Sequence, residues 1–137
     1  MRVVFVHGAC VRDGSWWWHR TAELLQERGV SSVAPALPSC GEAGLPGGVG
    51  GPGLSEDVAS VRQVLQDSDE PTVVVAHSYG GIITAEAAAG IGSVRHLLLV
   101  SSYLPEVGVE AGEVAEGRRE AVAAVAADGL GAVAVVG

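Results

Sequence analysis

Short apolar runs alternate with longer amphipathic segments along most of the chain. Four runs have the composition of buried strands, at residues 2–6, 30–34, 72–76 and 94–100. Three segments have the composition or the spacing of helices, at residues 16–28, 54–66 and 82–89. Strands that alternate with helices predict right-handed crossovers and a parallel sheet covered on both faces. The expected fold class is therefore α/β, with three αβα layers.

The three tryptophans lie together near the start of the first predicted helix, which we expect Ser15 to cap and Gly29 to end. Helical spacing places side chains on two neighbouring faces, one with Trp17, Thr21 and Leu24 and one with Trp18, Ala22 and Leu25. Aromatic residues at this spacing usually belong to a core. We therefore expect one or two tryptophans to pack on the sheet and one to be half-exposed, rather than a ligand-binding cluster.

The composition changes at Val107, after which Gly, Ala, Val and Glu dominate and no aromatic residue follows. A length of 137 residues allows one domain at most. We expect its core to cover residues 1–106, with a sheet truncated after about four strands. Residues 107–137 form a tail, in which 113–127 could be a helix and 130–136 a short strand or an unstructured apolar end.

A serine occupies the predicted turn between the third strand and the third helix. The sequence Ala76-His77-Ser78-Tyr79-Gly80 is a G-x-S-x-G pattern with alanine in the first glycine position. Such a turn lifts the hydroxyl clear of the sheet and needs small residues two positions before and after it. We expect Ser78 to be the catalytic nucleophile and the Tyr79 N–H to stabilise an oxyanion. The alternative is an ordinary strand-to-helix turn that happens to contain serine.

Other candidate site residues follow the first and fourth strands. Small residues come directly after the first strand, and such a loop lets backbone amides face a ligand. We expect the Ala9 N–H to be the second oxyanion donor. Because ligands of parallel sheets bind beyond the carboxyl ends of the strands, these segments should meet at one edge. The residues expected to line or support the pocket are His7, Gly8, Cys10, His77, Gly80, Ser102 and Tyr103.

The formal net charge is −8, with eight arginines and no lysine. An acidic chain without a basic run is a poor candidate for binding nucleic acid or an anionic membrane. No apolar run reaches the length of a membrane span, and Met1 leads into a strand rather than a signal peptide, so we expect a cytoplasmic protein. Cys10 and Cys40 lack the spacing of a disulfide framework or a metal site, and we expect two reduced thiols and no metal.

Several segments together resemble the α/β-hydrolase family, in particular its small members related to plant methyl-ester esterases and hydroxynitrile lyases. They follow the family's order and about its spacing within residues 1–109, and they are residues 5–10, 14–18, 37–41, 76–81 and 101–105. The resemblance implies cofactor-free hydrolysis of a small ester or acyl compound by a serine nucleophile, with Ala9 and Tyr79 as oxyanion donors. The lyases of this group use a lysine near the site, so its absence here favours an esterase-type hydrolase.

The α/β-hydrolase family places its acid and its histidine base after the serine. His96 is the only histidine that follows Ser78, and we expect it at the opposite edge of the sheet. His7, His19 and His77 are interpreted as structural. We therefore expect the acid and the base to lie outside this chain, as in the front half of such an enzyme, and the activity to be impaired.

Two alternatives to an active hydrolase stay open. The chain could be a non-catalytic fragment or a small-molecule binding domain that keeps the pocket without the chemistry. It could also need a partner chain to complete its sheet, because the fourth strand would be an exposed apolar edge that favours self-association. Turnover of a small ester would distinguish an enzyme from a binding domain, and sedimentation would report the association state.

Overall fold

The computed structural model describes residues 1–42, 44, 50–102 and 132–136. The strands within these ranges are β1 (Arg2–Val6), β2 (Ser31–Val33), β3 (Thr72–His77), β4 (Val94–Val100) and β5 (Ala132–Val136). The helices are α1 (Gly14–Gln26), α2 (Leu54–Gln66) and α3 (Gly80–Ala87), with a 3-10 turn, η1, at Pro38–Cys40. The helix predicted at residues 113–127 lies outside the described residues.

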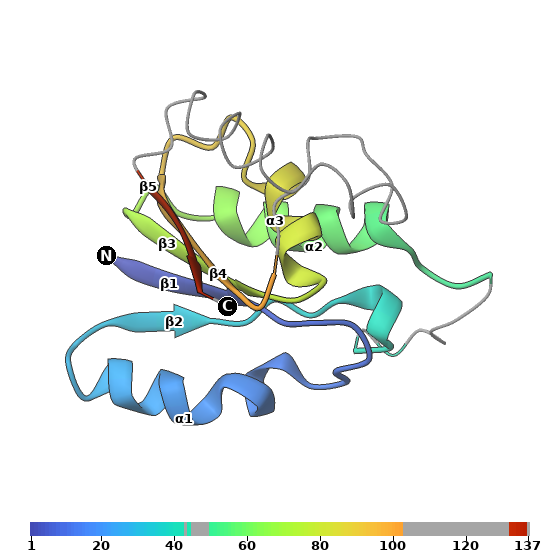
Figure 1. The fold of residues 1–137 in the computed structure, drawn as a ribbon, viewed down its shortest axis with the longest axis horizontal. Helices are drawn as coiled ribbons and strands as arrows, with labels where there is room; N and C mark the ends of the chain where they lie inside the picture. The colour runs from blue at the N-terminus through green and yellow to red at the C-terminus, as the bar shows by residue number, and fades with distance from the viewer. Residues whose placement is uncertain (43, 45–49, 103–131, 137) are drawn as a thin grey trace.

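The strands form one parallel sheet with the order β2-β1-β3-β4-β5 (Figure 1). The prediction of an α/β fold with a parallel sheet is therefore confirmed. The fifth strand extends the sheet beyond the four that the sequence predicted, and it corresponds to the strand alternative for residues 130–136. It pairs with β4 from His96 to Val100, so the edge of β4 that was expected to be exposed is covered.

Helices cover both faces of the sheet, with α1 on one side and α2 and α3 on the other (Figure 1). This arrangement is the expected three-layer architecture. The chain moves from β1 to β2 in one direction and then returns across β1 to β3 and β4. The order therefore reverses between β1 and β3, and open α/β sheets bind ligands beyond the carboxyl ends of the strands at this point.

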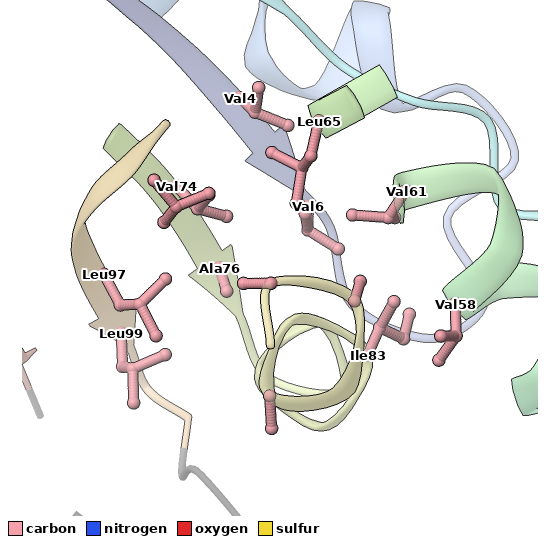
Figure 2. Close-up of a cluster of buried hydrophobic side chains, with 14 of the residues drawn as sticks. Val4, Val6, Val58, Val61, Leu65, Val74, Ala76, Ile83, Leu97 and Leu99 are labelled. Carbon is pink, nitrogen blue, oxygen red and sulfur yellow. The ribbon is translucent and has the colours of Figure 1, made fainter. Parts of the chain in front are cut away.

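The larger hydrophobic core lies between the sheet and the helices α2 and α3 (Figure 2). Alternate residues of a strand face the same side, so two alternate residues each of β1, β3 and the second half of β4 enter this core. The helices close the core with residues at helical spacing, as predicted for α2. The labelled members in Figure 2 are Val4, Val6, Val58, Val61, Leu65, Val74, Ala76, Ile83, Leu97 and Leu99.

The smaller core lies between the opposite face of the sheet and α1. The stripe of Trp18, Ala22 and Leu25 packs against β1 and β3, and the Trp18 ring stacks on Phe5 at 4.6 Å. The neighbouring stripe faces outward, and its Trp17 is 47% exposed. Trp16, which belongs to neither stripe, is 66% exposed. As predicted, one tryptophan, Trp18, packs on the sheet and another, Trp17, is half-exposed, whereas Trp16 is more exposed than predicted.

The ends of α1 differ in part from the prediction. Asp13, rather than Ser15, caps the helix, and its carboxylate accepts a hydrogen bond from the Trp16 N–H at 2.8 Å. The expected cap was wrong because the helix begins at Gly14, one residue before Ser15, so the residue in the capping position is Asp13. Gly29 follows the helix with a φ of +73°, as its predicted role requires. Within the described ranges, no helix is long and apolar enough to cross a membrane.

The larger core generates a stability prediction. Leu65 is 0% exposed in this core, whereas Leu24 on α1 is 53% exposed. We expect Leu65→Ala to lower the free energy of unfolding by about 2–5 kcal/mol, because it leaves a cavity. The matched control Leu24→Ala should change it by less than about 0.5 kcal/mol. Urea unfolding followed by circular dichroism measures both, and similar losses in the two variants would contradict the packing described.

Candidate active site

Ser78 lies at the tip of the turn between β3 and α3. Its φ of +51° is in the left-handed region, which is uncommon for a residue with a side chain, and the residue is exposed. The surrounding backbone holds this conformation, since Ser78 N–H donates to the Val100 carbonyl at 3.3 Å and the Gly81 N–H donates to the Ser78 carbonyl at 3.1 Å. The turn therefore presents the serine to solvent at the carboxyl edge of the sheet.

Gly80 allows α3 to start directly against the end of β1. A Cβ at this position would lie 2.5 Å from the carbonyl oxygen of Val6 and 2.8 Å from that of His7. Both distances are far below van der Waals contact, and both neighbours are backbone atoms that cannot rotate away. The glycine two positions after the serine is therefore required by the close approach of helix and strand.

The loop after β1 runs against the serine turn. Gly8 is buried, and a Cβ there would lie 3.2 Å from the Cβ of Ser78 and 3.1 Å from the Nδ1 of His77. Ala9 and Cys10 follow as exposed residues, and Cys10 is a free cysteine with a φ of +66°. The structure thus brings the loop after the first strand and the serine together at the reversal point between β1 and β3.

Ser102 joins the same edge from the end of β4. Its hydroxyl donates to the Ser78 carbonyl oxygen at 2.5 Å, so it contacts the backbone of the serine turn. Ser101, just before it, has a φ of +45°. Tyr103, which the sequence placed beside Ser102, lies outside the described residues.

His7 is buried beneath the loop and paired with Glu42. The Nε2 of His7 lies 2.5 Å from the Glu42 carboxylate, and its Nδ1 lies 2.8 Å from the Gly8 carbonyl oxygen. Sequence reasoning missed Glu42, which follows η1 in a glycine-rich segment that belongs to no periodic pattern. A carboxylate 35 residues from its partner leaves no local signal that could have identified it.

Asp57 is a second buried carboxylate near the site. It lies in the first turn of α2, is 0% exposed, and accepts hydrogen bonds from the Ser39 N–H at 2.9 Å and the Ser39 hydroxyl at 2.5 Å. Its other partner is the Tyr79 hydroxyl at 2.9 Å. The sequence indicated only that an acidic residue suits the start of a helix. Burial, followed by the hydrogen bond to Asp57, raises the pKa of Tyr79.

The histidines are not bonded to the serine hydroxyl in the described part of the chain. His19 bonds the Trp16 carbonyl on α1, and His96 lies in β4 opposite Val73, four residues before the end of the strand. The His77 ring lies against Trp17 with 6.0 Å between the ring centroids. The buried Nδ1 of His77 has no hydrogen-bond partner among the described residues.

The fold and the serine turn define a class of protein, and the comparison with known families agrees. The model of the alpha/beta hydrolase family matches residues 3–135. The chain therefore belongs to the α/β-hydrolase family, as the resemblance of its motifs implied.

Two curated relatives are methylesterases of Arabidopsis thaliana. Methylesterase 8 is 30% identical over 113 residues, which cover 75% of this chain and 38% of the relative. Methylesterase 7 is 28% identical over 117 residues, which cover 77% of this chain and 41% of the relative. The chain thus spans about two fifths of the length of the curated relatives that it matches.

Solved α/β-hydrolases share the fold at lower identity. A pyrethroid hydrolase from Sphingobium faniae JZ-2 has a TM-score of 0.65 at 22% identity, covering 80% of this chain and 42% of its own. An extracellular α/β-hydrolase from a Paenibacillus species has a TM-score of 0.63 at 17% identity, and the match covers 77% of this chain and 42% of the hydrolase. Tomato methylketone synthase I in complex with 2-tridecanone has a TM-score of 0.64 at 20% identity, and the match covers 88% of this chain and 47% of the synthase.

The contact at Gly80 can be tested by adding one carbon. We expect Gly80→Ala to lower the free energy of unfolding by about 3 kcal/mol, because the new methyl group meets the backbone of β1. Gly92→Ala is the matched control, since a Cβ at Gly92 meets nothing within 4 Å, and it should stay within about 0.5 kcal/mol. Urea unfolding compares the two variants, and a neutral Gly80→Ala would contradict the close approach.

The raised pKa of Tyr79 predicts a dependence of stability on alkaline pH. In the unfolded chain the phenol ionises near pH 10, whereas the folded chain keeps its proton to higher pH. The unfolded state then binds fewer protons, so the free energy of unfolding falls as the pH rises above about 10. Urea unfolding from pH 8 to pH 11 should show a steeper fall for the unaltered chain than for Tyr79→Phe. Parallel curves would contradict the raised pKa.

Proposed function

We propose that the chain carries the nucleophile and the oxyanion donors of a serine carboxylic-ester hydrolase that acts on a small acyl substrate. Ser78 is the nucleophile, and the N–H groups of Ala9 and Tyr79 are the donors. The observation that carries the proposal is the exposed Ser78 with a φ of +51°, at the end of β3 and against the Gly8 loop. The two methylesterase relatives make methyl esters the first natural substrates to test.

The proposed chemistry is acyl transfer in two steps. The Ser78 hydroxyl oxygen bonds to the carbonyl carbon while its proton passes to a base. The carbonyl oxygen becomes an oxyanion that accepts hydrogen bonds from the two N–H groups. The alcohol then leaves with a proton, and water hydrolyses the ester that Ser78 carries. The reaction uses no cofactor.

The base is the part of this mechanism that the described residues do not supply. None of the histidines described is hydrogen-bonded to the Ser78 hydroxyl, and the sequence has no histidine after His96. Our proposal places the acid and the base outside this chain. Preorganised donors retain roughly 10³-fold catalysis over water when triad members are removed, so slow acylation is expected.

The proposal predicts a serine-dependent reaction with an activated ester. Mixing the chain with p-nitrophenyl acetate should acylate Ser78 and release p-nitrophenol at least about tenfold faster than Ser78→Ala does. Mass spectrometry of peptides should find the acetyl group on Ser78. The matched control Ser31→Ala changes an exposed serine at the start of β2 and should react like the unaltered chain.

Equal rates for the unaltered chain and Ser78→Ala would remove Ser78 from the mechanism. The absence of a bonded histidine favours one other function, a small-molecule binding domain that keeps the pocket without the chemistry. Saturable binding of a non-hydrolysable acyl compound, without acylation of Ser78, would support that function instead.

A further inference from the structure

The buried pair of His7 and Glu42 lies under the candidate site but is not a reacting group in the proposed chemistry. The His7 side chain is 0% exposed and the Glu42 side chain 8% exposed, with 2.5 Å between Nε2 and the nearer carboxylate oxygen. Burial of two such polar side chains is unfavourable unless both are hydrogen-bonded. Their hydrogen bonds therefore indicate what the pair holds in place.

Glu42 connects three segments that are distant in the sequence. One carboxylate oxygen accepts from the Gly14 N–H at 2.5 Å, and the other accepts from the Leu37 N–H at 2.6 Å and faces His7. The carboxylate thus ties the start of α1 and the segment after β2 to the imidazole. Gly14 also restricts the ring, because a Cβ at that position would lie 2.5 Å from the His7 Cδ2.

The other ring nitrogen of His7 holds the loop of the site. Its Nδ1 lies 2.8 Å from the Gly8 carbonyl oxygen, and because a carbonyl oxygen only accepts, Nδ1 must carry a hydrogen. The Gly8 carbonyl and the Ala9 N–H belong to one planar trans peptide unit, in which they point in opposite directions. A carbonyl held toward the buried imidazole therefore directs the Ala9 N–H away from it.

We propose that His7, oriented by Glu42, is a positioning residue that sets the direction of the Ala9 N–H. Its consequence for catalysis rests on the proposed function, in which this N–H is an oxyanion donor. The hydrogen bond from His7 is needed because Gly8 has more backbone freedom than other residues. Rotation of the peptide between Gly8 and Ala9 would turn the Ala9 N–H away from its direction. A Cβ at Gly8 would lie 3.1 Å from the His77 Nδ1 and 3.2 Å from the Ser78 Cβ, so a larger residue there would require these side chains to shift.

The test compares His7→Leu with His7→Asn. The asparagine amide can donate to the Gly8 carbonyl in place of Nδ1, whereas leucine has no donor. Residual dipolar couplings measure the direction of the Ala9 N–H. The rate of p-nitrophenol release from p-nitrophenyl acetate measures acylation of Ser78. We expect His7→Leu to change the Ala9 coupling and to slow acylation by about 10²-fold at unchanged KM, the loss typical of one oxyanion donor. His7→Asn should restore most of both.

His19→Leu is the matched control. The Nδ1 of His19 also bonds a backbone carbonyl, that of Trp16 at 2.5 Å, but this bond lies within α1 and involves no residue of the Gly8 loop. This variant should alter neither the Ala9 coupling nor acylation. An unchanged coupling and an unchanged acylation rate in His7→Leu would overturn the proposal.

The unaltered chain provides a second measurement in case the His7 variants do not fold. Nitrogen-15 NMR of the imidazole should find a hydrogen on Nδ1 of His7, and a bare Nδ1 would overturn the proposal. If the proposed function is wrong but the positioning role of His7 is right, the measurements give a different result. In that case the unaltered chain would not acylate Ser78, while the Ala9 coupling would still differ between His7→Leu and His7→Asn.

Discussion

The close contact between the first turn of α3 and the end of β1 is the constraint on which the site depends. Without a side chain at Gly80, the helix begins against the carbonyl groups of Val6 and His7. This approach forces a sharp turn at Ser78, whose left-handed backbone persists because the hydrogen bond to Val100 and the packed helix hold it from both sides. The same contact brings the loop after β1 against the serine, so one steric requirement assembles both halves of the site.

Two buried carboxylates stabilise the irregular segments around this contact. Glu42 binds the segments after β1 and β2, and Asp57 joins α2 to η1 and to Tyr79. Within the described ranges, the partners of both carboxylates are backbone N–H groups, hydroxyl groups and an imidazole, rather than arginines. Loops at a sheet edge lack the repeating hydrogen bonds of helices and strands, and such side-chain acceptors take their place. The carboxyl edge is therefore ordered by polar contacts, while the faces of the sheet are ordered by apolar packing.

Most of the fold could be predicted because its signals are local. The limits of β1, α2 and β4 agree with the prediction, since each is a strongly periodic or continuously apolar segment bounded by turn residues. Finer features were decided by packing. Helical spacing offered two stripes on α1, and only the docked helix selects the one that contains Trp18. The sequence analysis expected Ser15 to cap α1, whereas the path of the loop places the Asp13 carboxylate at the Trp16 N–H.

For the candidate site, the sequence established the segments that carry Ser78 and the loop of Gly8, and the order of strands and helices indicated that they meet at one edge. The buried partners came only from the tertiary structure, because Glu42 lies 35 residues from His7 and Asp57 lies 22 residues from Tyr79. A nucleophile turn can be identified from consecutive residues, because the strained serine and the small residues around it belong to one strand-turn-helix unit. A buried carboxylate carries no such pattern, since an acidic residue in a loop or in the first turn of a helix is expected to be solvated until folding removes the water and supplies its donors.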